Sequence, residues 1–241
     1  MIKVIKETKF LTDNKENQSL NKELEQKTYE LLGRVEKYSP ETYIHSFSTG
    51  YICDRIACEV EGITDKDKML LHYAALLHDV GKTKIPHKVL HKHAKFTDEE
   101  FEIMKQHPVF SNEILKRHNL PDVVIDAATD HHEKLNGRGY PNHKTAKDIS
   151  LLTRILTVAD IISALSVERS YRSSMSHEGI IEVLVNEVNI GDIDKTIAEK
   201  AIQLMNRGEL DFDAVHRHEI PYKFDPQNKI EEFKSPEFVV D

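Results

Sequence analysis

The sequence predicts an all-α fold, and three observations support this prediction. Apolar residues recur at helical spacing along most of the 241 residues. Helix-start and helix-end signals divide this pattern into successive segments. No stretch of useful length shows the two-residue alternation typical of a strand. Together these features predict a helical bundle with short connections.

The expected helices can be placed in order along the chain. Capping residues, prolines and glycines mark where most of them begin and end. They cover residues 18–38 and about 41–60, a third from Thr64 or Asp65 to about His78, a fourth from the capping box at Thr97–Glu100, one with Pro108 in its first turn, one from Pro121 to His131, and then 148–167, about 176–189 and about 194–206. Glycine and proline predict a loop at 136–141.

The composition is that of an ordinary globular protein, with 39% hydrophobic and 31% charged residues. The net charge of -8 argues against general attraction to DNA, RNA or anionic membranes. No apolar run approaches the roughly 20 residues that cross a bilayer, and the N-terminus does not resemble a signal peptide. Cys53 and Cys58 point to different faces of one helix, so we expect reduced core thiols in a cytoplasmic protein.

Histidines and carboxylates inside apolar segments point to a metal centre. Of the 14 histidines, several follow one another or an aspartate within such segments. Asp160 lies in an apolar helix, where an unpaired carboxylate would be costly. Any one of these residues is explained by a hydrogen bond or an ion pair, but the set suits Fe, Mn, Zn or Ni. The candidate ligands are Glu41, His45, His78, Asp79, His107, His131, His132 and Asp160.

Five segments of the chain resemble a known family. They are HDVGKTKIP, DEEFEIMKQHP, HHEKLNGRGYP, ISLLTRILTVAD and ALSVERSYR, in family order within residues 40–208. These segments are similar to the HD-GYP phosphodiesterases, a branch of the HD-domain metallohydrolases. The resemblance implies an HD-domain helical bundle with a GYP loop. It divides the chain into an N-terminal helical extension (1–40), a catalytic domain (41–208) and a C-terminal tail (209–241).

The resemblance also implies an activity: metal-dependent hydrolysis of cyclic di-GMP to pGpG, GMP or both. It makes the eight candidates ligands of two or three divalent ions, with Fe or Mn favoured over Zn or Ni. Glu41 would serve a third ion, although a helix dipole alone also favours an acid there. Asp79 would bridge two ions that share an attacking hydroxide. The residues expected at the substrate are Lys82, Gly139, Tyr140, Pro141, Arg169 and Arg172.

Several alternatives remain open at this stage. Ser163 stands where the family usually carries an acid. If that acid transfers protons, the serine would alter the rate of hydrolysis; if the acid only orients a metal ligand, the serine could partly replace it. The substrate could instead be cyclic GMP-AMP, pGpG or a mononucleotide, or the chain could be a non-catalytic receptor. The helix at 18–38 either dimerises or packs on its own core. The GYP loop faces either the substrate or a signalling partner.

Overall fold

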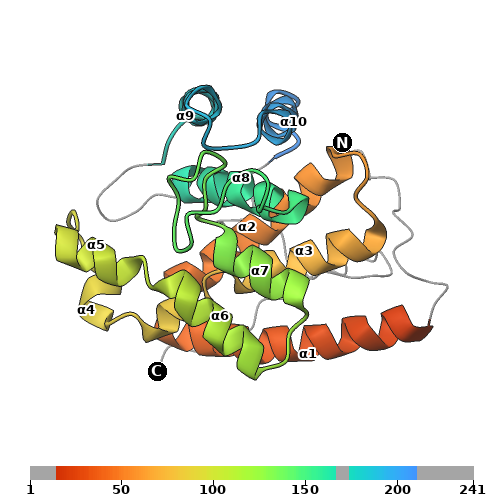
Figure 1. The fold of residues 1–241 in the computed structure, drawn as a ribbon, viewed down its shortest axis with the longest axis vertical. Helices are drawn as coiled ribbons and strands as arrows, with labels where there is room; N and C mark the ends of the chain where they lie inside the picture. Colours follow the sequence, from red (N-terminus) through yellow and green to blue (C-terminus); the bar gives the residue numbers. More distant parts are fainter. Residues whose placement is uncertain (1–14, 167–173, 211–241) are drawn as a thin grey trace, which may run out of the picture.

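The computed structural model describes residues 15–166 and 174–210 and confirms the all-α prediction (Figure 1). Within these ranges there is no strand, and an isolated antiparallel bridge joins Asn136 and Thr145. No helix in the same ranges is both long and apolar enough to span a membrane. The elements are α1 (Lys15–Tyr38), α2 (Pro40–Glu59), α3 (Asp65–Leu77), the 3-10 helix η1 (Val80–Lys84), α4 (His87–Leu90), α5 (Asp98–Met104), α6 (His107–Arg117), α7 (Asp122–Asp130), α8 (Leu151–Ser166), α9 (His177–Asn189) and α10 (Lys195–Asn206).

Capping side chains start the helices close to where the sequence predicts. Thr64 and Thr97 each form a complete capping box with the acid three residues later. Helix α8 begins three residues later than the expected residue 148. The reason is Ser150, whose hydroxyl accepts a hydrogen bond from the backbone N–H of Thr153 at 3.1 Å and so takes the capping position.

Helices α2, α3, α7 and α8 form the centre of the bundle, and α1 lies across α2 and α3 (Figure 1). The apolar side of α1 is buried in this core, at Leu24, Leu31, Leu32 and Val35. The helix therefore packs on its own chain, which was one of the two alternatives. At the other end, α9 and α10 cover α8.

The outer boundaries of the predicted domains remain predictions. Leu210 is buried in the core, and Glu209 pairs with Arg55 of α2. The rest of the predicted tail lies outside the described residues.

One expectation about the thiols is wrong: Cys53 is buried, but Cys58 is exposed. Cys58 lies five residues after Cys53 in α2, so its side chain points away from the face of the helix that is buried.

Candidate metal centre

Three of the candidate histidines occupy helix ends in the same way. His78 and His131 directly follow the last turns of α3 and α7. His107 comes shortly after the end of α5 and is the first residue of α6. In each, ring atom Nδ1 lies within hydrogen-bond distance of the carbonyl oxygen three residues earlier. The pairs are His78 with Ala75 (2.7 Å), His107 with Met104 (2.7 Å) and His131 with Ala128 (2.8 Å). Because a carbonyl only accepts, Nδ1 carries a proton in each of the three rings, and Nε2 is the atom that faces the centre.

These Nε2 atoms and that of His45 converge on the carboxylate of Asp79, which lies between α3 and η1. Oδ2 of Asp79 lies 3.3 Å from Nε2 of His78 and 3.7 Å from Nε2 of His45. Oδ1 lies 3.2 Å from Nε2 of His107 and 3.9 Å from Nε2 of His131. The two oxygens of one carboxylate therefore face two different sets of histidines.

Each set has the composition of a metal site. The first consists of His45, His78 and Asp79, and Oδ1 of Asp160 lies 2.9 Å from Nε2 of His45. The second consists of His107, His131 and His132, with donor atoms within 4.8 Å of one another. Seven of the eight predicted ligands thus meet in one buried region, and Asp79 lies between the two sets.

The carboxylate of Asp79 indicates that these residues suit a cation. Its Oδ1 is buried and accepts no hydrogen bond. The nearest nitrogen atoms are Nε2 of His107 at 3.2 Å and Nε2 of His131 at 3.9 Å. A buried carboxylate oxygen without a hydrogen bond is unfavourable in the protein alone and favourable beside a divalent ion. Mixed imidazole and carboxylate ligation suits Fe, Mn, Zn and Ni alike.

Burial and mutual charge set the protonation of these groups. Burial lowers the pKa of His131 to about 3. Burial also opposes charge on His78, but Asp79 and Asp160 raise its pKa overall to about 10. Burial would raise the pKa of Asp79, yet Lys82 and His78 hold it well below its usual range. At neutral pH, His131 and Asp79 are therefore ready to bind a cation, whereas His78 must first lose a proton.

The lowered pKa of His131 predicts that the metal-free protein is sensitive to acid. The unfolded chain takes up this proton near pH 6.5, whereas the folded protein takes it up only near pH 3. Stability is therefore present above pH 6.5 and is lost as the pH falls, by up to about 1.4 kcal/mol per unit. Urea unfolding of the metal-free protein between about pH 7 and pH 5 measures this slope. The H131N variant should show a shallower slope, and an unchanged one would contradict the assignment.

The other predicted site residues lie in different surroundings. The ammonium group of Lys82 lies 2.5 Å from Oδ2 of Asp79. Glu41 is exposed in the first turn of α2 and belongs to neither set, so its role with a third ion remains a prediction. Arg169 and Arg172 lie outside the described residues.

The GYP loop closes over the second set of histidines. The ring of Tyr140 stacks on His132 with centroids 4.8 Å apart, and the Tyr140–Pro141 bond is cis. Gly139 lies against the backbone of Glu133, where an added Cβ would be 2.4 Å from Cα. The buried Glu133 accepts hydrogen bonds from the backbone N–H groups of Asn142 (2.5 Å) and Lys144 (3.0 Å). These contacts hold the loop against the candidate site.

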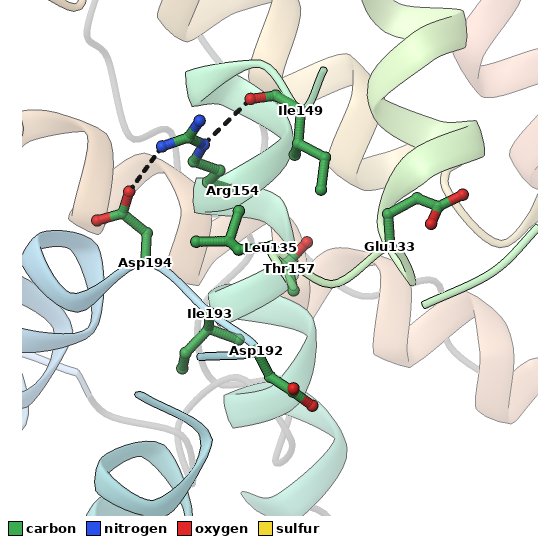
Figure 2. A pocket seen from close by; sticks show the side chains of 8 residues that line it. All are labelled: Glu133, Leu135, Ile149, Arg154, Thr157, Asp192, Ile193 and Asp194. Atoms are coloured by element: carbon green, nitrogen blue, oxygen red, sulfur yellow. Dashed lines mark hydrogen bonds and ion pairs between the residues drawn. The ribbon is translucent and has the colours of Figure 1, made fainter. Parts of the chain in front are cut away.

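The outer side of the loop is fixed to the turn between α9 and α10. The side chains of Asn136 and Arg138 donate to the carboxylate of Asp192 at 2.6 Å and 2.8 Å. Figure 2 shows the small pocket behind the loop, where Arg154 of α8 reaches Asp194 and the carbonyl of Ile149. The loop is therefore held on its inner side by residues close to it in sequence and on its outer side by residues more than 50 positions away.

The D192N variant tests this outer attachment. Losing the charge should weaken two charge-assisted hydrogen bonds and lower the free energy of unfolding by about 1–3 kcal/mol. Thermal unfolding of the metal-free protein measures the stability. As a matched control, E199Q on α10 alters an exposed acid with an exposed lysine partner and should leave the stability unchanged. If D192N and E199Q had the same free energy of unfolding, Asp192 would not be holding the loop.

Three residues that support the centre were not singled out by the sequence. The hydroxyl of Ser111 donates to the carbonyl of His78 (2.8 Å) and accepts from the backbone N–H of Gly81 (2.9 Å). Thr157 donates to the carbonyl of His131 at 3.0 Å. Glu133 stood in the motif HHE without an assigned role. The sequence contains no signal for the buried Ser111 and Thr157, because serine and threonine are also common on helix surfaces.

Residues 18–197 match the family model described as HD domain. The chain belongs to the HD domain family. This HD-domain chain is 38% identical over 159 residues to the 3′3′-cGAMP-specific phosphodiesterase 2 of Vibrio cholerae, covering 65% of this chain and 30% of that protein. It is 33% identical over 210 residues to a cyclic di-GMP phosphodiesterase of Thermotoga maritima, covering 84% of this chain and 57% of that protein.

Solved structures agree on the HD-domain fold. The HD domain of the Listeria monocytogenes phosphodiesterase PgpH matches with a TM-score of 0.54 and 19% identity, over 74% of this chain and 98% of that one. Bd1817 of Bdellovibrio bacteriovorus, an HDG"Y"P protein, matches with a TM-score of 0.59 and 18% identity, over 79% and 64%. The match to the HD domain model and the curated relatives, together with this fold, confirm the resemblance to HD-GYP phosphodiesterases. The HD-domain chain spans 30% of the length of the first of its curated relatives.

Proposed function

We propose that this chain is a metal-dependent phosphodiesterase that opens cyclic dinucleotides. The observation that carries the proposal is the carboxylate of Asp79, whose two oxygens face two separate sets of ligand-type side chains. Hydrolysis of a phosphodiester requires an activated water, neutralisation of phosphate charge and a stabilised leaving oxygen. Two divalent ions, when bound, supply this chemistry.

The side chains of the centre divide these tasks. His45, His78, Asp79 and Asp160 would hold one ion, and Asp79 with His107, His131 and His132 would hold the other; Glu41 is retained as a candidate for a third. The three carbonyl-bonded histidines hold their Nε2 atoms toward the centre before any ion binds. Preorganisation of this kind reduces the cost of assembling the site.

Lys82 is proposed to bind a phosphate oxygen of the substrate. Its ammonium group already reaches the carboxylate of Asp79, so a phosphate bound at the centre lies within its range. Tyr140, with Gly139 and Pro141, is proposed to border the substrate site, because its ring stacks directly on the ligand candidate His132. Arg169 and Arg172 are proposed as further phosphate contacts on the resemblance alone.

Replacing Lys82 with methionine tests its role. The variant keeps a flexible apolar stem but loses the charge, so we expect at least a tenfold loss in kcat/KM, about 1.4 kcal/mol or more. The matched control is K84M on the same short helix, where Lys84 pairs with the partly exposed Glu113 instead. Equal activity of the two variants would exclude a role for Lys82 at the phosphate.

The proposed substrate is cyclic di-GMP, giving pGpG, GMP or both. A second candidate is 3′3′-cGAMP, because named relatives act on each of these two dinucleotides. The decisive experiment incubates anaerobically purified protein of known Fe and Mn content with each dinucleotide and with GMP. Turnover of a cyclic dinucleotide but not of GMP is the expected result. Fully metal-loaded protein that binds these dinucleotides without cutting either would instead support a receptor.

A further inference from the structure

His45 differs from the other ligand candidates in the partner of its Nδ1 atom. His78, His107 and His131 each donate from Nδ1 to a carbonyl three residues earlier. His45 lies in the middle of α2, where the carbonyl groups already accept the hydrogen bonds of the helix. Its Nδ1 instead lies 2.9 Å from the hydroxyl of Ser163, which α8 brings to it from across the core. Ser163 is fully buried.

A hydroxyl differs from a carbonyl because it can both donate and accept a hydrogen bond. Nε2 of His45 lies 2.9 Å from Oδ1 of Asp160, so without a cation Nε2 carries the proton and donates it there. Nδ1 then has a lone pair, and the hydroxyl of Ser163 donates to it. When Nε2 binds a cation, the proton sits on Nδ1, and the same hydroxyl accepts it. A carboxylate or a carbonyl in place of this hydroxyl could only accept a hydrogen bond, so it would suit only the tautomer with the proton on Nδ1.

We propose that Ser163 is a positioning residue that supports His45 in both tautomers, so that the metal position of His45 can be emptied and refilled without leaving a buried ring nitrogen unpaired. The proposal rests on the metal centre of the proposed function. The set of His107, His131 and His132 contains two histidines whose Nδ1 atoms are fixed by carbonyl partners, and among the residues that the structure describes no ring in this set has a partner like Ser163. The cation held by His45 therefore exchanges more readily than the cation held by this second set.

The tautomer of His45 provides a test that needs no enzymatic turnover. Nitrogen-15 NMR of the imidazole rings is recorded on metal-free full-length protein and again after addition of Zn²⁺. In the wild type we expect the proton of His45 to move from Nε2 to Nδ1 when Zn²⁺ binds, while His78, His107 and His131 carry it on Nδ1 in the zinc-loaded protein. A metal-free wild type in which His45 already carries its proton on Nδ1 would overturn the proposal.

Competition with a chelator measures the affinity for the two most tightly bound Zn²⁺ ions. The S163A variant should bind one of them about 10–100-fold more weakly, because its ligand loses an outer hydrogen bond, and should bind the other as before. The S163T variant keeps the hydroxyl and should retain both affinities. The matched control is S48A on α2, since the buried hydroxyl of Ser48 has no hydrogen-bond partner.

The outcomes separate this inference from the proposed function. If S163A binds both ions as the wild type does, or if S163A and S163T weaken binding equally, Ser163 does not position His45. If the wild type shows the tautomer change and binds Zn²⁺, yet its Fe- or Mn-loaded form hydrolyses no cyclic dinucleotide, the proposed function fails and the role of Ser163 stands. Wild-type protein that takes up no Zn²⁺ overturns the role of Ser163 in metal exchange.

Discussion

Replacing Asp79 with asparagine is expected to lower kcat for cyclic dinucleotides by about 10³-fold or more and to remove at least one bound metal ion. Asparagine keeps the shape of the side chain but removes the charge, and it puts an amide N–H₂ where one set of ligands now meets a carboxylate oxygen. Because Oδ1 and Oδ2 face different sets of histidines, either orientation of the amide disturbs one of them. Activity and metal content should therefore fall together.

The matched control for this variant is D126N on α7. Asp126 is an exposed aspartate one helical turn before Asp130 and belongs to neither set of ligands, so activity and metal content should stay unchanged. Element analysis of both variants, purified in parallel and checked for helical content, makes the comparison. Normal metal content and normal turnover in D79N would exclude the bridging position of Asp79 and with it the proposed mechanism.

Gly81→Ala is expected to disrupt both the fold and the metal centre. An added Cβ would lie 2.0 Å from the carbonyl oxygen of His107 and 2.4 Å from the backbone nitrogen of Ser111. Both are backbone atoms, so the clash can be relieved only by moving η1 away from α6. That movement breaks the hydrogen bond from Gly81 to Ser111 and separates His107 from Asp79. We expect a loss of about 3 kcal/mol or more in unfolding free energy, together with loss of bound metal.

The same substitution at Gly33 is the control. A Cβ at Gly33 meets no atom within 4 Å, and the residue lies inside helix α1. Alanine should therefore stabilise the protein by up to about 1 kcal/mol through the helix backbone. Denaturant unfolding of both variants gives the two free energies. A G81A protein as stable and as metal-rich as the wild type would show that η1 and α6 are not packed as described.

Local sequence was sufficient to predict most of the fold. Capping at Thr64 and Thr97 depends on residues three positions apart, so the starts of α3 and α5 can be recognised without tertiary information. The same holds for the candidate ligands: polar residues such as Asp160 stand out within apolar helices, because burying them alone is costly. The expected burial of Cys58 failed, since helical spacing shows two faces but not which of them is buried.

The sequence by itself determined the all-α class, the order of the helices and the set of histidines and carboxylates that meet in the centre. Only the tertiary structure decided that each oxygen of Asp79 faces a different set, that the backbone around His107 leaves no room for a side chain at Gly81, and that Ser163 contacts His45. These contacts join residues up to 118 positions apart. They depend on how helices pack against one another, which no pattern within a single helix encodes.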